Sequence, residues 1–178
     1  MSSSPSPRGT TSFRDKLAIE IAMAGGIGRI KKAPGTFGSL PGLLVGAGIH
    51  AAATPFLRLS PAAYHATIIL LLGAVTALAY WSIAQTERVL HVHDDQRIVV
   101  DEVAGQAIAV AWMPRIWLAY FAAFLLFRLF DISKPSLIGK IDRDVAGAWG
   151  TLGDDLLAGA VAAVIGAALL YFLPEGLV

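Results

Sequence analysis

Residues 59–86 read LSPAAYHATIILLLGAVTALAYWSIAQT and contain no Asp, Glu, Lys or Arg. A helix of about 20 apolar residues crosses the hydrocarbon core of a bilayer, so this stretch is long enough to span a membrane. We expect a helix with its core at Tyr64–Ala84 and its start at Pro61, because proline is tolerated in the first helical turn. The alternative is a core helix of a soluble bundle, buried by protein instead of lipid.

Three further apolar stretches extend this pattern along the chain. Gly38–Leu57 and Leu156–Leu173 carry no charged residue, and Pro174 is expected to close the second of them. Val103–Phe127 is interrupted only at Met113-Pro114-Arg115, which is typical of a turn between two helices that are each short for a full span. We therefore predict an all-α fold, a polytopic membrane helical bundle of spanning and half-spanning helices with loops at the cytoplasmic face.

The composition supports a membrane protein and excludes several functions. The chain of 178 residues is 56% hydrophobic and 15% charged, whereas about a quarter of an average soluble domain is charged. The net charge of +1 gives no reason to expect nucleic acid as a partner. The absence of cysteine excludes disulfides and Cys-ligated zinc. Residues 1–20 begin with a polar stretch rich in Ser, Pro and Arg, which predicts a disordered tail before a single domain at 21–178.

The distribution of Lys and Arg predicts the orientation, because cytoplasmic loops of membrane proteins are enriched in these residues. The N-terminal segment through Lys32 is expected inside, and the connection that carries only Arg58 outside. Gln85–Val100 should return inside, the turn at Arg115 should lie outside, and Arg128–Asp155 should lie inside. The C-terminus is then outside, and all the acidic pairs share the cytoplasmic face.

Acidic residues are concentrated in one part of the chain, since ten of the thirteen lie between Glu87 and Asp155. A carboxylate beside a long apolar run is unfavourable unless a cation satisfies it. Hard divalent ions bind carboxylate and phosphate oxygens, so the pattern predicts a metal site with an oxygen-rich substrate. Glu87 matches no motif and is expected to be a solvated interfacial charge. The candidate metal ligands are Asp94, Asp101, Glu102, Asp131, Asp142, Asp154 and Asp155, with Asp95 as a further carboxylate.

Each acidic motif also has a structural explanation. The helix macrodipole favours a carboxylate such as Asp101 at the start of a helix, and Asp154-Asp155 would cap the last apolar helix. Asp131 and Lys134 are three residues apart, so they would share a helical face as an ion pair, before the helix ends at Pro135. Their convergence on one predicted face favours the metal site over separate capping roles.

A glycine-rich segment, GIGRIKKAPGTFGS at residues 26–39, precedes the first long apolar helix. Backbone N–H groups at the start of a helix near Gly38 could hold an anion, and Lys31 and Lys32 add positive charge. The same segment is equally compatible with an interfacial loop whose lysines meet lipid headgroups.

These segments together resemble the phosphatidylglycerophosphatase A family, over almost the whole chain beyond the tail. The residues that carry the resemblance are Ala33-Pro34-Gly35-Thr36 with Gly38-Ser39-Leu40, His93-Asp94-Asp95 with Ile98-Val99 and Asp101-Glu102, Phe127-Arg128 with Phe130-Asp131-Ile132 and Lys134-Pro135, and Asp142-Arg143, Gly147, Gly150, Asp154-Asp155 and Ala158-Gly159.

The resemblance implies a Mg²⁺-dependent lipid phosphatase of the bacterial inner membrane, with its active site facing the cytoplasm. Such an enzyme hydrolyses phosphatidylglycerophosphate to phosphatidylglycerol and phosphate in phospholipid biosynthesis, so its partners are that lipid and the bilayer. On this interpretation the catalytic residues are Asp95, Asp101, Asp131, Lys134 and Asp155, with Asp95 orienting or deprotonating the attacking water. The residues expected to bind the phosphate are Lys32, Gly35, Thr36, Ser39 and Lys134.

Two other functions remain open from the residues themselves. A membrane cation transporter would place its acidic residues near the middle of spanning helices. A non-catalytic membrane subunit would use the carboxylates only as helix caps. The oligomeric state is not indicated by any feature of the sequence.

Overall fold

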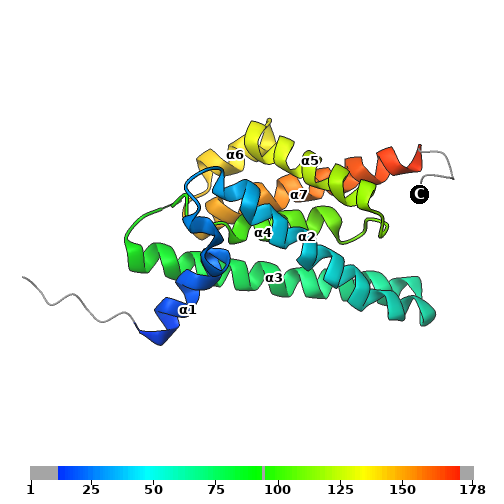
Figure 1. Cartoon of the computed structure of the whole chain (residues 1–178), viewed down its shortest axis with the longest axis horizontal. Coiled ribbons are helices and arrows are strands. Elements are labelled where there is room, and N and C mark those ends of the chain that lie inside the picture. The colour runs from blue at the N-terminus through cyan, green and yellow to red at the C-terminus, as the bar shows by residue number, and fades with distance from the viewer. Residues whose placement is uncertain (1–11, 94, 173–178) are drawn as a thin grey trace, which may run out of the picture.

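The computed structural model describes residues 12–93 and 95–172, and every regular element in these residues is a helix (Figure 1). Three long helices extend along the bundle, α2 (Pro34–Ala53), α3 (Pro61–Leu90) and α7 (Ala148–Tyr171). Each is long and apolar enough to cross a membrane, α2 together with the turn that follows it. The predicted all-α bundle with membrane-spanning helices is confirmed.

Two shorter helices, α4 (Val100–Val110) and α5 (Trp117–Ser133), form a hairpin around the predicted turn at residues 113–115. The 11 residues of α4 rise only about 16 Å, roughly half the thickness of a bilayer core. This helix is therefore half-spanning, as expected for this part of the chain. Most of its residues are buried, so α4 forms the centre of the bundle with α2 and α7 packed against it.

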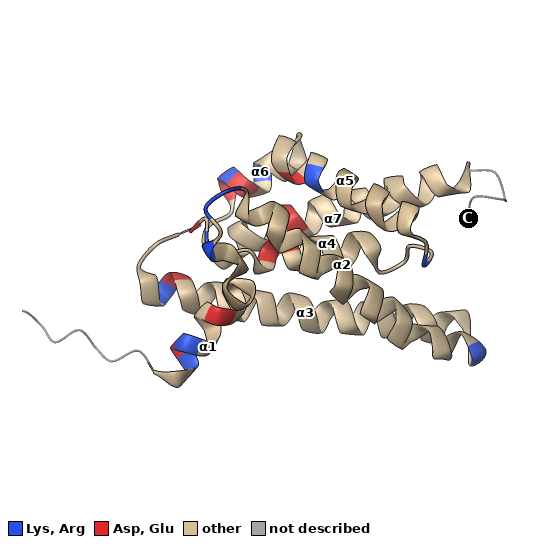
Figure 2. Ribbon diagram, viewed as in Figure 1, with Lys and Arg blue, Asp and Glu red and all other residues tan. Residues whose placement is uncertain are grey.

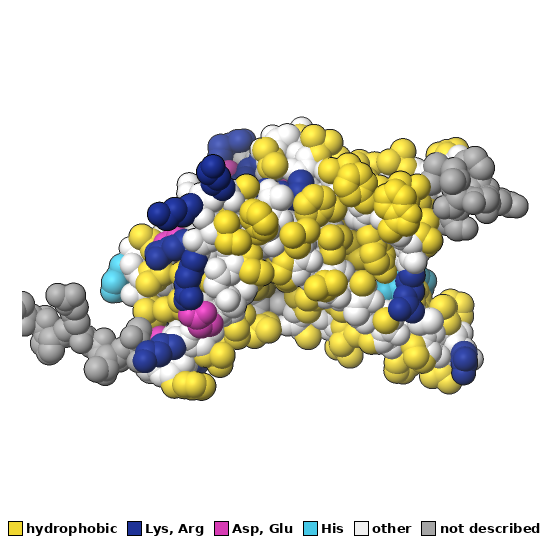
Figure 3. Space-filling view, in the orientation of Figure 1, with side chains coloured by type: hydrophobic (Ala, Val, Ile, Leu, Met, Phe, Trp, Pro, Cys, Tyr) yellow, Lys and Arg dark blue, Asp and Glu magenta, His cyan; other side chains and the backbone are white. Residues whose placement is uncertain are grey.

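The remaining helices are short and lie at the ends of the bundle. They are α1 (Phe13–Ala22), η1 (Ala24–Arg29), η2 (Thr54–Arg58) and α6 (Leu137–Asp144). Lys, Arg, Asp and Glu gather at the end that holds α1, α6 and the connection from α3 to α4 (Figure 2). At the opposite end, the connections between α2 and α3 and between α4 and α5 carry Arg58 and Arg115. Hydrophobic side chains cover most of the face between the two ends (Figure 3).

Helix α1 corrects the predicted disordered tail at residues 1–20. It begins at Phe13 behind a capping box, in which the Asp15 N–H donates to Ser12 Oγ at 3.2 Å and the Ser12 N–H donates to the Asp15 carboxylate at 3.1 Å. Such reciprocal bonds satisfy two backbone donors and stabilise the start of a helix. Polar composition alone did not distinguish this capping sequence from disorder. Residues 1–11 lie outside the described residues.

Several helix boundaries can be compared with those predicted from the positions of proline. Helix α3 begins at Pro61 as predicted, and α5 ends at Ser133, before Pro135, as predicted. Helix α2 was expected to begin near Gly38, but it begins at Pro34, because proline is favoured at the first position of a helix. Pro174 lies outside the described residues.

The start of α7 corrects the expectation that Asp154-Asp155 caps the last helix. Helix α7 begins at Ala148, so both carboxylates lie in its second turn and are buried. Nor does Asp101 cap α4, whose N-cap residue is Val99. The prediction relied on stretches without charged residues, so it placed the start of this helix at Leu156, after the two aspartates.

Glycines allow α2, α4 and α7 to pack in close contact. A Cβ added to Gly42 would lie 2.6 Å from Gln106 Cβ, and one added to Gly159 would lie 2.1 Å from the Gly105 carbonyl oxygen. One added to Gly105 would lie 2.5 Å from the Asp155 carbonyl oxygen. Small residues permit this approach of helix backbones in membranes. The crossing at Gly105 and Gly159 therefore brings the first turns of α4 against the second turn of α7.

We predict that Gly159→Ala destabilises the bundle by about 1–3 kcal/mol, because its methyl group has no space at the crossing with α4. The matched control is Gly73→Ala in α3, where an added Cβ meets no atom within 4 Å. Thermal unfolding in detergent micelles should show a lower transition temperature for Gly159→Ala alone. Equal transition temperatures for the two variants would contradict the packing described here.

Candidate functional site

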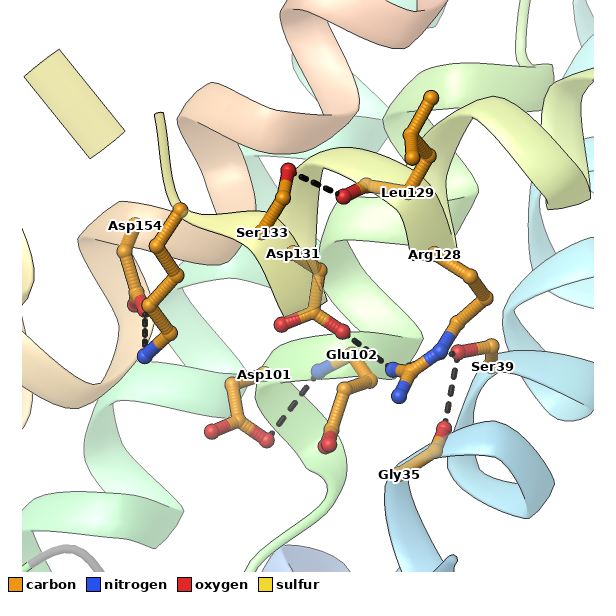
Figure 4. Close-up of polar contacts among 10 residues, drawn as sticks. Gly35, Ser39, Asp101, Glu102, Arg128, Leu129, Asp131, Ser133 and Asp154 are labelled. Atoms are coloured by element: carbon orange, nitrogen blue, oxygen red, sulfur yellow. Dashed lines mark hydrogen bonds and ion pairs between the residues drawn. The ribbon is translucent and has the colours of Figure 1, made fainter. Parts of the chain in front are cut away.

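Three carboxylates from two helices meet where α4 crosses α7. Asp101 and Glu102 belong to the first turn of α4, and Asp155 belongs to α7. One oxygen atom from each carboxylate lies within 4.8 Å of the other two. Asp101 is 7% exposed, Asp155 is 4% exposed and Glu102 is half-buried, so little of the surface of the cluster reaches solvent. Figure 4 shows Asp101 and Glu102 directed into the space below Asp131 of α5.

The electrostatics of this cluster favour a cation. Burial raises the pKa of the Asp101 carboxyl well above its ordinary value, and the neighbouring Glu102 and Asp155 charges raise it further. Burial also raises the pKa of Glu102, whose Oε2 is buried with no hydrogen-bond donor among the described residues. A divalent cation would remove both the repulsion and the unsatisfied acceptor. The donor set, carboxylate oxygens alone, is the type that hard ions such as Mg²⁺ prefer.

A polar cavity of about 410 Å³ opens over the three carboxylates. It lies between the N-terminal end of α2, the connection from α3 to α4, and the ends of α5, α6 and α7. Its wall consists of Lys31, Ala33, Pro34, Asp95, Gln96, Ile98, Asp101, Glu102, Asp131, Lys134, Asp142, Thr151, Asp154 and Asp155. Six of the predicted metal ligands thus border one cavity, and the seventh, Asp94, lies outside the described residues.

Lys134 supplies a positive charge to this wall, but with different partners from those predicted. Its ammonium lies 2.5 Å from Asp142 Oδ1 and 2.7 Å from Asp154 Oδ2. Burial opposes the charge, yet the hydrogen bonds to these two carboxylates outweigh it and raise the pKa of Lys134. The residue follows the end of α5 with a φ of +41°, which turns it away from the expected pairing with Asp131. Asp142 and Asp154 therefore hold Lys134 and lie outside the three-carboxylate cluster.

Arg128 is a second cation of the site that the sequence did not single out. Its side chain is 14% exposed, and Nη1 donates to the Asp131 carboxylate and to Ser39 Oγ, the latter at 3.4 Å (Figure 4). From the sequence, Arg128 counted as one of the charges that orient the chain and as part of the motif Phe127-Arg128, and no role in the site was assigned to it. Its position three residues before Asp131 was an available signal, because residues so spaced face each other on a helix.

The residues expected to bind phosphate are mostly not at the cavity. Of that group only Lys134 lines the wall, and Lys31 takes the place expected for Lys32. Ser39 is fully buried, and its Oγ donates to the Gly35 carbonyl at 2.8 Å. Thr36 lies in the first turn of α2, where its N–H donates to the Ala33 carbonyl at 3.0 Å.

Gly35 has a packing role that the anion-binding hypothesis missed. A Cβ at this position would lie 2.1 Å from Glu102 Oε1 and 3.2 Å from Arg128 Nη1. A larger residue would therefore displace the Glu102 carboxylate or the first turn of α2. The glycine leaves room for the Glu102 carboxylate beside α2, and the cavity itself begins at the neighbouring Pro34.

Asp95 borders the cavity but is held by an arginine. Arg97 donates from Nε to Asp95 Oδ1 at 2.8 Å and from Nη2 to Asp95 Oδ2 at 2.6 Å. These hydrogen bonds lower the pKa of the Asp95 carboxyl below its ordinary value. A carboxylate with a lowered pKa accepts a proton less readily, so the geometry disfavours Asp95 as the base that activates water.

Glu87 corrects another expectation, since it is not a solvated charge. Its side chain is 12% exposed and accepts hydrogen bonds from Thr151 Oγ1 at 3.0 Å and from His93 Nδ1 at 2.8 Å. Thr151 lines the cavity, so Glu87 lies directly behind the wall. The sequence could not show this contact, because it depends on an α7 that starts at Ala148.

A family model and two relatives that cover most of this chain carry the same name. A family model described as Phosphatidylglycerophosphatase A matches residues 20–170, which include the whole cavity wall. A protein of Haemophilus influenzae named phosphatidylglycerophosphatase A is 35% identical over 155 residues, which cover 86% of this chain and 88% of that protein. A protein of the same name from Escherichia coli is 34% identical over 157 residues, covering 86% of this chain and 81% of its own length. No solved structure matches the chain.

The acidic cluster predicts cation binding that can be measured without any substrate. Mn²⁺ should raise the thermal transition temperature of the wild type, and Asp155→Asn should weaken the binding of Mn²⁺ at least about tenfold. Without metal, Asp155→Asn should be more stable than the wild type, because one of three mutually repelling carboxylates is removed.

Asp144→Asn is the matched control, since Asp144 is exposed and is not part of the cavity wall. Electron paramagnetic resonance of free Mn²⁺ gives the affinity of each variant. An affinity of Asp155→Asn equal to that of Asp144→Asn would contradict the assignment of the cluster as a cation site.

Proposed function

Because this chain belongs to the phosphatidylglycerophosphatase A family, we propose that it hydrolyses phosphatidylglycerophosphate to phosphatidylglycerol and inorganic phosphate with Mg²⁺ as its cofactor. The observation that carries the proposal is the single cavity that is lined both by the three clustered carboxylates and by Lys134. Carboxylates suit a metal ion and the ammonium suits a phosphate, so the cavity has groups for both. Its position at one end of an apolar bundle suits a lipid whose headgroup must leave the bilayer.

We place this cavity at the cytoplasmic face of the bacterial inner membrane. The support is the charge distribution, because α1, η1, α6 and the connection from α3 to α4 carry many Lys and Arg residues at the cavity end. The two connections at the opposite end carry only Arg58 and Arg115. The positive-inside rule then assigns the cavity end to the cytoplasm.

Asp101, Glu102 and Asp155 are the residues that would hold Mg²⁺. When bound, the ion would neutralise phosphate oxygens and lower the pKa of a coordinated water, which are its usual contributions to phosphoryl hydrolysis. The buried Glu102 Oε2 without a donor is the feature of the chain that supports this assignment.

The ammonium of Lys134 acts on the phosphate. Lys134 stays protonated because Asp142 and Asp154 hold its ammonium and raise its pKa. It is therefore ready to donate to phosphate oxygens and to stabilise the charge that develops as the bond between phosphorus and the glycerol oxygen breaks.

Asp131 is better placed than Asp95 to orient the attacking water. Arg128 holds one oxygen of the Asp131 carboxylate, and the other points away from Arg128 into the cavity (Figure 4). A carboxylate fixed at one oxygen keeps the second in a defined position to accept a hydrogen bond from water. This assignment replaces the role that the sequence suggested for Asp95.

The two alternative functions explain the site less well. A subunit with carboxylates as caps requires them at helix termini, but Asp154 and Asp155 lie inside α7 and are buried. A cation transporter requires a path through the bundle, whereas the acidic residues of the cavity gather at one end of it (Figure 2).

Purified protein should release phosphate from phosphatidylglycerophosphate in mixed micelles with Mg²⁺, and EDTA should abolish the release. Asp101→Asn should reduce the rate by about 100-fold or more, because the cluster loses one of the three carboxylates that would hold Mg²⁺. Asp144→Asn serves again as the control and should keep the wild-type rate. Release that persists in EDTA, or a wild-type rate for Asp101→Asn, would refute the proposed mechanism.

Lys134 gives a second test by substitution. Lys134→Met should lower kcat/KM by about 10²–10³-fold, since the phosphate loses a preorganised cation. Lys134→Arg should retain more activity than Lys134→Met, because it keeps the positive charge between Asp142 and Asp154. Steady-state phosphate release measures both variants, and equal activities would show that the charge of Lys134 is not used.

A further inference from the structure

An apolar groove runs along the outer face of α2, beside the catalytic cavity. It has a volume of about 290 Å³ and is lined by Ile27, Ile30, Phe37, Leu40, Pro41 and Leu44. The four lining residues of α2 extend over about 10 Å along the helix axis. Three of them are well exposed, Phe37 at 43%, Leu40 at 44% and Leu44 at 77%.

The groove is continuous with the rim of the cavity. Ile30 lines the groove, and the next residue, Lys31, lines the cavity. Pro34 lines the cavity, and Phe37, one helical turn further along α2, lines the groove. An elongated molecule with a polar head in the cavity and an apolar tail in the groove therefore has to cross only the short rim formed by residues 31–34.

The position of the groove suits a lipid tail. It follows α2, one of the helices long and apolar enough to span a membrane, from the cavity end toward the middle of that helix. An acyl chain in this groove stays in apolar surroundings while its headgroup reaches the polar cavity, so the lipid need not leave the bilayer. Lys31 and the exposed Lys32 place positive charge where the headgroup would cross the rim.

We propose that this groove holds an acyl chain of the phospholipid substrate, and that Lys31 at the rim contacts the phosphodiester that joins the lipid to its terminal phosphomonoester. This inference rests on the proposed function, and it adds how the lipid is aligned for the reaction. The phosphomonoester enters the cavity toward Lys134, and the phosphodiester stays at the rim. The acyl chain follows α2 away from the cavity, toward the middle of the helix. The groove thereby selects a membrane lipid over a soluble phosphate ester.

A larger apolar groove on another face does not serve this purpose. It has a volume of about 540 Å³ and is lined by α3, α4 and α7 from Ile69 to Ala167. Its α7 residues begin at Ala160, and a packed layer that includes Ala79, Ala104 and Leu156 lies between them and the cavity end. A lipid there would have no direct path to the acidic cluster.

Photo-crosslinking tests the groove without requiring turnover. The probe is phosphatidylglycerophosphate with a diazirine on one acyl chain, bound to the full chain in phosphatidylcholine nanodiscs containing EDTA. We expect labelling at residues 37–44, and we expect excess unlabelled phosphatidylglycerophosphate to suppress it. Leu40→Trp should reduce this labelling about tenfold, because the indole fills the groove.

The matched control is Leu125→Trp in α5, a position of similar exposure, 50% against 44% for Leu40. It should leave the labelling of residues 37–44 unchanged. Labelling that is spread equally over α2, α3 and α5, or that phosphatidylglycerophosphate does not suppress, would overturn the proposal. A crosslink between two copies through α2 would also overturn it, because it would make the groove a protein interface.

A kinetic comparison separates the groove from the reaction itself. With Mg²⁺, Leu40→Trp should raise the ratio of KM for dioleoyl to KM for dihexanoyl phosphatidylglycerophosphate by about tenfold, and Leu125→Trp should not. If the ratio for Leu40→Trp equals that of the wild type while phosphate is still released, the groove does not hold the acyl chain, and the proposed hydrolysis stands. Specific labelling of residues 37–44 by a wild type that releases no phosphate would reject the hydrolase and retain the lipid groove.

Discussion

The close crossing of α4 and α7 is the contact on which the site depends. Gly105 and Gly159 have no side chains to separate the two backbones, and an added Cβ at Gly159 would meet the Gly105 carbonyl at 2.1 Å. This contact places Asp155 beside the first turn of α4, where Asp101 and Glu102 lie. Three carboxylates thus become neighbours at the base of the cavity, and their mutual repulsion makes a bound cation favourable. Gly35 completes the arrangement by letting α2 approach Glu102.

The other charges of the site are divided by their partners. Lys134 forms ion pairs with Asp142 and Asp154. Arg128 pairs with Asp131, and Arg97 pairs with Asp95. The carboxylates of Asp101, Glu102 and Asp155 lie close to one another, and the negative charge of Asp131 lies beside Asp155. A list of acidic residues that looks uniform in the sequence therefore separates into a candidate metal-binding cluster and several ion pairs. This division lets a single cavity offer both an acidic face to a metal and a cationic group to a phosphate.

The sequence predicted the membrane helices well where charge was absent, and less well where charge entered a helix. The uncharged run at residues 59–86 predicted α3 with its start at Pro61, and the turn at 113–115 predicted the break between the half-spanning α4 and α5. Helix α7 was shortened in the prediction, because Asp154 and Asp155 in its second turn resemble a polar boundary. Helix α1 was missed for a similar reason, since its charged and polar residues suggest disorder until Ser12 and Asp15 are recognised as a cap.

The sequence by itself determined the class of the protein, its family and the set of acidic residues, because hydropathy and motif order are properties of the chain alone. Only the tertiary structure decided which carboxylate binds which partner. Asp131 and Lys134 are three residues apart, yet Lys134 pairs with Asp142 and with Asp154 of α7. Ser39 was expected at the phosphate and is instead buried against Gly35 and Arg128. These pairings depend on how helices cross, and a crossing is set by the absence of side chains at Gly105 and Gly159 as much as by the charges themselves.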